Sequence, residues 1–195
     1  MSWSEKELYS YLGAFMNILH NIQTTDRNGD GLELAAGIRD GVEIIQALKL
    51  DGGKLVFIGN GGSAAIASHQ ATDFIRACAI PAFAPLDPTL LTCMGNDLGY
   101  DNVFSEPLKL LANAGDVLVA ISSSGRSANI LKAVSLMHEK DLRVITLSGF
   151  DPDNPLRKLG DINFYVPSDS YRHVESAHLF VCNWLLDFTH KSMNR

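Results

Sequence analysis

The sequence has few cysteines and no long hydrophobic run. Its 195 residues include three cysteines, Cys78, Cys93 and Cys182, and each lies within an apolar stretch. We therefore expect buried thiols in a reducing compartment rather than a disulfide framework. Charged side chains such as Glu5 and Glu7 stand where a secretory signal needs an apolar core, and no apolar run reaches the roughly 18 residues of a membrane span. We expect a cytoplasmic protein that does not enter a membrane.

Positive charge is also scarce. Sixteen Lys and Arg against 22 Asp and Glu give a formal net charge of −6. This balance disfavours a protein that neutralises nucleic-acid phosphates, so we expect no nucleic-acid partner. Hydrophobic residues make up 46% of the chain and charged residues 19%, which is enough apolar material for a sizeable core. Because there is no internal repeat, linker or low-complexity tract, we predict one domain over residues 1–195.

The first 50 residues have the pattern of a helical extension. Apolar residues at helical spacing predict one amphipathic helix over about residues 3–24 and a second that ends near residue 50. Between them, residues 26–31 copy the first half of a calcium-binding EF-hand loop. The twelfth position of that loop is Gly37 instead of the Glu that closes such sites. We therefore interpret the segment as a turn that begins the second helix.

From residue 51 onward, short apolar runs alternate with helical stretches. Nearly continuous β-branched and apolar runs indicate strands that are covered on both faces, and their alternation with helices indicates parallel βαβ units. We predict an α/β fold, a doubly wound, mostly parallel, five-stranded sheet of flavodoxin-like type over residues 51–195, closed by a helix over about 170–192. The predicted strands are residues 54–58, 82–84, 117–121, 143–147 and 162–166.

Two turns after predicted strands are candidates for ligand binding. The sequence GNGGSAA begins at Gly59, and the sequence SSSGRS follows the third strand with hydroxyls at Ser122, Ser123, Ser124 and Ser127. Glycines allow close approach of a ligand, and hydroxyls at a helix N-terminus add donors for a phosphate. No GxGxxG or GxxxxGK[ST] motif is present, so a small phosphorylated ligand fits better than a nucleotide. The alternative is that Gly and Ser gather in any strand-to-helix turn.

Four segments together carry a resemblance to a known family. The segments GNGGSAAIASH, GNDLGYDNVFS, ISSSGRSANI and ITLSGF resemble the sugar-isomerase (SIS) domain family over essentially the whole chain. Within it they resemble the phosphoheptose isomerase branch, which interconverts sedoheptulose 7-phosphate and D-glycero-D-manno-heptose 7-phosphate. The resemblance implies an aldose–ketose isomerase of heptose synthesis for surface polysaccharides such as lipopolysaccharide.

The resemblance also implies roles for particular residues. Substrate contacts would come from Asn60, Gly61, Gly62, Ser63, Asn96, Asp97, Ser122, Ser123, Ser124 and Ser127, together with Asp73 and Glu175. The catalytic residues would be Asp73 and Glu175. A zinc and acid–base set would fall on His69, Asp73, Glu175 and Asn183, whose spacings of four and eight residues place each pair on one helix face. The alternative is that these side chains are merely solvated.

Three of these positions depart from the pattern of the family's isomerases, and one of them is Glu175, which stands at the place of a Gln. Asp73 is one methylene shorter than the Glu expected there, and Asn183 replaces a His and exchanges no proton at ordinary pH. Neither His173 nor His178 is predicted to substitute for it. A non-catalytic branch, the replication-initiator-associating proteins, resembles this chain in having Asn at that place. The sequence thus leaves two hypotheses: a phosphosugar isomerase, or a phosphosugar-binding or scaffold protein without chemistry.

The resemblance finally implies an assembly. Such folds form homotetramers in which the leading helices pack into a central bundle and active sites lie near subunit interfaces. The first predicted helix offers more apolar surface than one short domain readily covers, with Trp3, Leu8, Leu12, Phe15, Met16 and Leu19.

Overall fold

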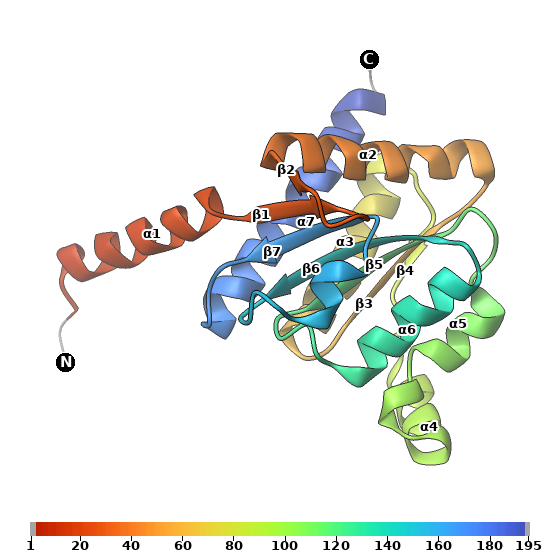
Figure 1. Ribbon diagram of the computed structural model, residues 1–195. Coiled ribbons are helices and arrows are strands. Elements are labelled where there is room, and N and C mark those ends of the chain that lie inside the picture. The colour runs from red at the N-terminus through yellow and green to blue at the C-terminus, as the bar shows by residue number, and fades with distance from the viewer. Residues whose placement is uncertain (1–2, 194–195) are drawn as a thin grey trace.

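One seven-stranded sheet forms the centre of the computed structural model, which describes residues 3–193 (Figure 1). The strand order is β2-β1-β7-β6-β5-β3-β4. The strands are β1 (Gln23–Asp26), β2 (Gly31–Leu32), β3 (Leu55–Gly59), β4 (Ala82–Phe83), β5 (Val117–Ser122), β6 (Arg143–Gly149) and β7 (Ile162–Val166). Strands β3 to β7 pair in parallel, as predicted, but the sheet has seven strands instead of the predicted five because β1 and β2 extend it at one edge. The β1–β2 and β1–β7 pairs are antiparallel.

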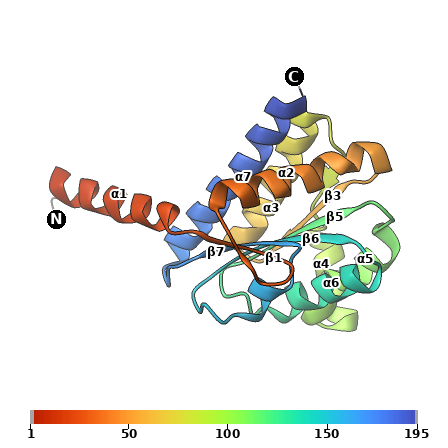
Figure 2. The ribbon, with the colours of Figure 1, turned by 45° about the horizontal axis from the view of Figure 1, so that its top comes forward.

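Helices cover both faces of this sheet. They are α1 (Glu5–His20), α2 (Leu34–Asp51), α3 (Gly62–Cys78), α4 (Pro88–Leu98), α5 (Ser105–Leu111), α6 (Ala128–Glu139) and α7 (Tyr171–Met193), with 3-10 turns at Tyr100–Asn102 and Pro155–Lys158. Alternate residues of the central strands face opposite layers, as a doubly wound fold requires. Phe57 and Val119 pack with α2, α3 and α7, whereas Ile58 and Leu118 pack with α5 and α6. Figure 2 shows the same two layers from a second direction.

The N-terminal prediction was wrong in detail. The first helix ends at His20, with Asn21 as its C-cap, and residues 23–26 form strand β1 against β7. Residues 26–31 are the turn of a β-hairpin, and the second helix begins only at Leu34. One carboxylate oxygen of Asp26 accepts hydrogen bonds from the backbone N–H groups of Asn28 and Asp30, both at 2.9 Å. The oxygen that resembled a calcium ligand therefore stabilises the hairpin turn.

Helix α1 extends away from the rest of the chain in both views (Figures 1 and 2). Its first turn is closed by a capping box between Ser4 and Glu7. Among its residues only Leu19 is buried, and Phe15 and Ile18 pack against the core at its C-terminal end. Most of its apolar surface is thus left uncovered within one chain.

Two of the three cysteines are buried as expected, and one is not. Cys78 and Cys182 lie in the core, and burial raises the pKa of the Cys182 thiol to about 12. Cys93 is exposed, because no residue of α4 is buried. Within the described residues, no helix has the length and apolar character needed to span a membrane.

Candidate functional site

A small polar pocket lies at the carboxyl ends of β3 and β5. These strands are neighbours, but the chain runs outward from β3 to β4 and then returns past β3 to form β5. Open α/β sheets bind ligands at such a reversal of strand order. The pocket has a volume of about 120 Å³. It is lined by Asn60, Ser63, Ser122, Ser123, Ser124, Ser127, Tyr171 and Glu175.

The predicted serine turn forms one wall of this pocket. Ser122 is the last residue of β5, and Ser127 is the N-cap of α6. Their hydroxyl oxygens are 3.3 Å apart. The Ser123 hydroxyl is buried and has no hydrogen-bond partner among the described residues, while Ser124 Oγ accepts from the backbone N–H of Arg126 at 3.3 Å. Converging hydroxyls with an unused donor are what an oxyanion requires.

Two helix N-termini point at the same place. Helix α3 begins at Gly62 and α6 at Ala128, directly after β3 and the serine turn respectively. Neither N-cap makes a side-chain capping bond, and neither first turn holds an acidic residue. Their free N–H groups and positive dipole ends therefore favour a bound anion. Gly125, at φ +60°, allows the sharp turn that leads from the serines into α6.

The side chain of Asn60 is held in a fixed orientation. Its amide exchanges two hydrogen bonds with the amide of Asn129, at 3.0 and 2.9 Å. The hydroxyl of Tyr100 also donates to Asn60 Oδ1 at 3.0 Å. Asn129 and Tyr100 were not among the predicted site residues, although both lie within segments that carried the family resemblance. They support the site by orienting Asn60 and do not line the pocket themselves.

Glu175 brings the one carboxylate among the pocket's lining residues. It lies one turn into α7, on the face toward α3. A Cβ atom on Gly62 would lie only 2.4–2.6 Å from the Glu175 carboxyl group, so this carboxyl group lies directly against the first turn of α3. The carboxylate therefore lies at the positive end of α3, beside the serine turn.

Tyr171 is a site residue that the sequence analysis missed. It is the first residue of α7 and lines the pocket one turn before Glu175. Its ring meets Phe150 edge-on, with centroids 4.6 Å apart. Phe150 is at φ +59°, and its backbone is fixed by bonds from its N–H to Ser168 O and from the Tyr165 hydroxyl to its own carbonyl. A strained bulky residue in this place indicates a constrained site, but neither its φ nor its contact is visible in the sequence.

Asn96 and Asp97 do not reach this pocket. Both are exposed on α4, and the Asn96 amide donates to Asp97 at 2.8 Å. The other carboxylate oxygen of Asp97 lies 3.6 Å from Cys93 Sγ. The backbone of Gly61 and Gly62 does border the pocket, because it links Asn60 to Ser63.

His69 and Asp73 lie together, away from the pocket. Their side chains are 3.1 Å apart on the outer face of α3, and Arg76 lies 3.4 Å from the same carboxylate. His69 and Gly62, where the Glu175 carboxylate sits, are seven residues apart in one helix, or about 10 Å along its axis. The Asp73 carboxylate thus contacts the His69 ring and the Arg76 guanidinium, and Asp73 does not line the pocket.

Asn183 is paired with an amide. It accepts a hydrogen bond from Gln70 Nε2 at 2.8 Å. Among residues 3–193, no three His, Cys, Asp or Glu side chains gather closely enough to hold a metal ion. The set implied by the resemblance, His69, Asp73, Glu175 and Asn183, therefore does not fit a zinc ion in this arrangement, and we derive no chemical step through a metal.

Two histidines of α7, His173 and His178, have structural surroundings. His178 is fully buried, its Nε2 lies 3.1 Å from the carbonyl of Ser148, and burial lowers its pKa to about 4. His173 packs against the rings of Tyr11 and Phe15, with centroids 5.0 and 6.0 Å away. Neither lines the pocket.

Comparisons with known proteins agree with this arrangement. A family model described as SIS domain matches residues 11–149. A phosphoheptose isomerase of Thiobacillus denitrificans is 37% identical over 162 residues, which cover 79% of this chain and 82% of that protein. The structure of a phosphoheptose isomerase from Neisseria gonorrhoeae is similar with a TM-score of 0.81 at 30% identity, covering 95% of this chain and 98% of that chain. The structure of a phosphoheptose isomerase from Francisella tularensis is similar with a TM-score of 0.82 at 26% identity, covering 97% of this chain and 100% of that chain.

Proposed function

Because the chain belongs to the SIS domain family, we propose that it is a phosphosugar isomerase. The proposed reaction interconverts sedoheptulose 7-phosphate and D-glycero-D-manno-heptose 7-phosphate for surface-polysaccharide synthesis. One observation carries the proposal: a serine-rich turn, a fixed amide and a carboxylate line one pocket at the reversal of strand order. The relatives named phosphoheptose isomerase support the choice of substrate.

The pocket is suited to the phosphate end of such a substrate. Its 120 Å³ is well below the roughly 300–1,000 Å³ of typical small-molecule sites, so the sugar chain extends beyond the serine turn. Ser122, Ser123, Ser124 and Ser127 bind the phosphate with the N–H groups of α6. The Tyr171 hydroxyl and the Asn60 amide then meet sugar hydroxyls at the mouth.

Aldose–ketose isomerisation moves a proton between neighbouring carbons. A base removes the proton from the carbon beside the carbonyl, the C–H electron pair becomes the C=C bond of an enediol, and the carbonyl oxygen takes up a proton. The base then returns its proton to the former carbonyl carbon. The hydroxyl on the other carbon loses its O–H proton as the new carbonyl forms, which balances the proton that the first oxygen took up. We assign this base to Glu175, because its carboxylate lines the pocket whereas Asp73 is bound by His69 and Arg76 outside it.

A second function has one observation in its favour. Asn183, at the place of the isomerases' histidine, is held by Gln70 and offers no titratable group. A protein that binds a phosphosugar as a sensor or scaffold needs the serine turn and no proton transfer. In that case the ligand binds and is recovered unchanged.

Assembly and location are part of the same proposal. We propose a cytoplasmic homotetramer whose active sites lie near subunit interfaces, with a small phosphosugar and no nucleic acid as its ligand. The uncovered apolar surface of α1 supports self-association. Light scattering at micromolar concentration tests this, and a monomer would contradict it.

A coupled assay tests the activity. Purified protein is mixed with sedoheptulose 7-phosphate, and formation of the aldose is followed by a reaction specific for it. The proposal predicts turnover by the unmodified protein and by Asp73→Asn, and its loss in Glu175→Gln. Ligand binding by calorimetry without turnover of any C5–C7 ketose phosphate would establish the binding function instead.

A further inference from the structure

A second polar cavity lies between the β1–β2 hairpin and the loop that follows β6. This hairpin cavity has a volume of about 420 Å³, which is within the range of sites that take a whole small molecule. It is lined by Thr25, Arg27, Asn28, Gly29, Pro152, Asp153, Arg157 and Lys158. None of these residues lines the serine pocket, so the two cavities are separate. The hairpin turn over residues 26–31, which copies half of a calcium loop in sequence, thus forms one wall of a cavity.

The lining of this cavity is positively charged in an acidic chain. Three cations and one carboxylate give it a formal charge of +2, against −6 for the whole chain: Arg27, Arg157, Lys158 and Asp153. Lys158 lies 3.7 Å from Asp153, but both side chains are more than half exposed, so water weakens this pair. Arg27 lies 3.5 Å from Asp161, a carboxylate that Arg143 already binds at 2.9 Å. The positive charge of the lining is therefore incompletely neutralised.

Arg157 is held in place without a carboxylate. One guanidinium nitrogen donates to the carbonyl of Pro152 at 2.8 Å and another to Gln23 Oε1 at 2.7 Å. The guanidinium carbon also lies over the ring of Tyr165, 4.2 Å from its centroid. Among the residues that the structure describes, no carboxylate lies within ion-pair distance of Arg157. Because a guanidinium has five N–H groups, a fixed and unpaired Arg157 keeps donors for an oxyanion.

The walls of the cavity are supported from within the fold. Asn154 is fully buried, and its amide donates to the carbonyls of Gly149 and Asp151 at 3.3 and 2.8 Å. Its Oδ1 accepts from the backbone N–H of Arg157 at 3.0 Å. On the hairpin wall, Gly29 is at φ +86° with open space where a Cβ atom would lie. The cavity therefore exists in the free chain, and a ligand does not have to order its walls.

The position of the cations determines the class of ligand. Arg27 belongs to the hairpin, whereas Arg157 and Lys158 belong to the 3-10 turn, so cations lie on both walls. An orthophosphate ion occupies a small part of 420 Å³, while two linked phosphoryl groups contact both walls. Arginine pairs with phosphoryl oxygens through two parallel hydrogen bonds, and lysine binds them as a point charge.

We propose that the hairpin cavity binds a small diphosphate, as the inorganic ion or as a diphosphate ester. One phosphoryl group lies on Arg157 and Lys158, and the other lies near Arg27. The inference does not rest on the proposed isomerase activity, because no residue of the serine pocket takes part.

Calorimetric titration with inorganic pyrophosphate, in a buffer without divalent metal, tests the site. All chains carry Ser122→Ala with Ser124→Ala, so that the serine turn does not compete for the ligand. We expect one pyrophosphate per chain and no measurable heat from orthophosphate at the same concentrations. Arg157→Gln should weaken pyrophosphate binding about ten- to hundredfold, because it removes charged hydrogen bonds. The matched control, Arg39→Gln, removes the same charge from an exposed side chain of α2 and should leave the affinity unchanged.

Lys158→Gln keeps the test valid if the loss of Arg157 disturbs folding. The Lys158 side chain is 67% exposed and lies 3.7 Å from Asp153, so its replacement should leave the melting temperature unchanged. Pyrophosphate binding should weaken about two- to tenfold. Citrate, a polyanion without phosphoryl groups, is the control ligand and should bind at least tenfold more weakly than pyrophosphate. Adenosine diphosphate distinguishes the two sources: tighter binding than pyrophosphate indicates an ester, and weaker binding indicates the inorganic ion.

Three results would overturn the proposal. The first is no pyrophosphate binding by the chain that lacks the two serines. The second is equal affinity for citrate, which would show that the cavity selects charge and not a diphosphate. The third is an unchanged affinity in both Arg157→Gln and Lys158→Gln, which would place the ligand elsewhere.

Discussion

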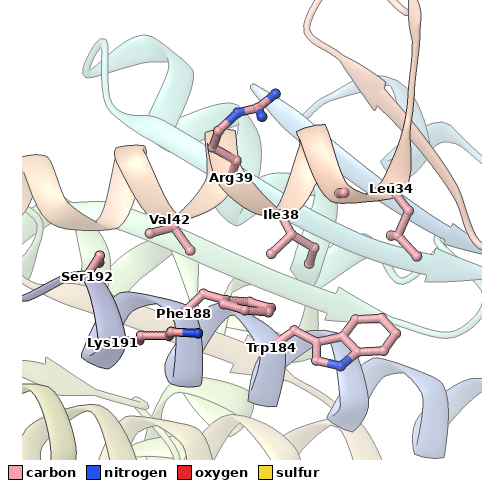
Figure 3. Close-up of a pocket in the computed structure, with 9 residues that line it drawn as sticks. Leu34, Ile38, Arg39, Val42, Trp184, Phe188, Lys191 and Ser192 are labelled. Carbon is pink, nitrogen blue, oxygen red and sulfur yellow. The ribbon is translucent and has the colours of Figure 1, made fainter.

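The serine-lined pocket differs in almost every physical property from the groove between α2 and α7, which is lined by Ile38, Val42, Trp184 and Phe188 among others (Figure 3). The pocket holds about 120 Å³ and is lined by hydroxyl, amide and carboxylate groups, whereas the groove holds about 700 Å³ and is lined mostly by aliphatic and aromatic side chains. Two helix N-termini end at the pocket. The groove lies along the sides of two helices, where backbone groups are already paired. Chemistry thus belongs to the smaller cavity, because donors and dipoles converge only there.

Helix α7 connects the two regions. Its first turn brings Tyr171 and Glu175 to the pocket, and its later turns bring Trp184 and Phe188 to the groove. His178 lies between them and contacts the carbonyl of Ser148 in β6. Substitutions in the first turn of α7 should therefore affect the pocket, and substitutions in its later turns should affect the groove. A substitution of His178 should affect both, because His178 anchors the part of α7 between them to β6.

The largest expected effect distinguishes Glu175, whose carboxylate lines the pocket, from Asp73, whose carboxylate lies outside it. Glu175→Gln should lower kcat by about 10²–10⁴-fold, because a general base contributes about that much. Inorganic phosphate should still bind, since the serine turn is unchanged. Asp73→Asn, the matched change, should leave kcat within a few-fold of the unmodified protein. The reverse order of effects in the coupled assay would return the role of base to Asp73.

Protonation of His178 should weaken the support shared by both regions. Its pKa is about 4 in the folded chain against an ordinary value of 6.5, so below pH 6.5 the unfolded chain binds the proton first. The free energy of unfolding should therefore fall by up to about 3 kcal/mol as the pH drops from 6.5 to 4. Urea titrations of the unmodified protein and of His178→Gln measure this slope. An equal slope in both would show that His178 is not its source, and His69→Gln serves as the exposed control.

The sequence predicted the pocket's serine turn but not its whole lining. The properties of a turn depend mainly on its own residues, so the residues from Ser122 to Ser127 predict a polar turn suited to a phosphate without any tertiary information. Tyr171 and Phe150 meet through a tertiary contact and a positive φ, which no spacing along the chain reports.

Long-range contacts also explain the other differences. Residues 23–26 form a strand because β7 offers them an edge, although the helical periodicity before them continues to Ile22. The four residues that the resemblance assigned to zinc share helix faces in pairs, as predicted from spacing. In the folded chain the Glu175 carboxylate lies against Gly62 at the start of α3, whereas His69 lies seven residues further along that helix beside Asp73. Tertiary packing therefore separates the two pairs.

Gly125→Ala tests whether the shape of the turn supports the pocket. A Cβ atom there would lie 1.9 Å from Asn154 Oδ1, at a φ of +60°. We expect a loss of about 1–3 kcal/mol in the free energy of unfolding and weaker phosphate binding. Gly13→Ala, in open space on α1, is the control and should be neutral or slightly stabilising. Unchanged unfolding and phosphate binding in Gly125→Ala would contradict the assigned turn.

The smallest expected effect concerns the mouth of the pocket. Tyr171→Phe keeps the ring on Phe150 and removes one hydroxyl, so KM for the sugar phosphate should rise about two- to tenfold. The Kd of inorganic phosphate should not change. If the affinity for both ligands fell by the same factor, the Tyr171 hydroxyl would contact the phosphate and not the sugar.

Calorimetric titration with inorganic phosphate and with sedoheptulose 7-phosphate tests the central claim most directly. Each hydrogen bond to a charged group contributes about 1.5–3 kcal/mol, so Ser122→Ala with Ser124→Ala should weaken both ligands about 10²–10⁴-fold. The melting temperature of the unliganded variant should stay close to that of the unmodified protein. Phosphate binding that survives this double change, with the anion located elsewhere in a soaked crystal, would contradict the account.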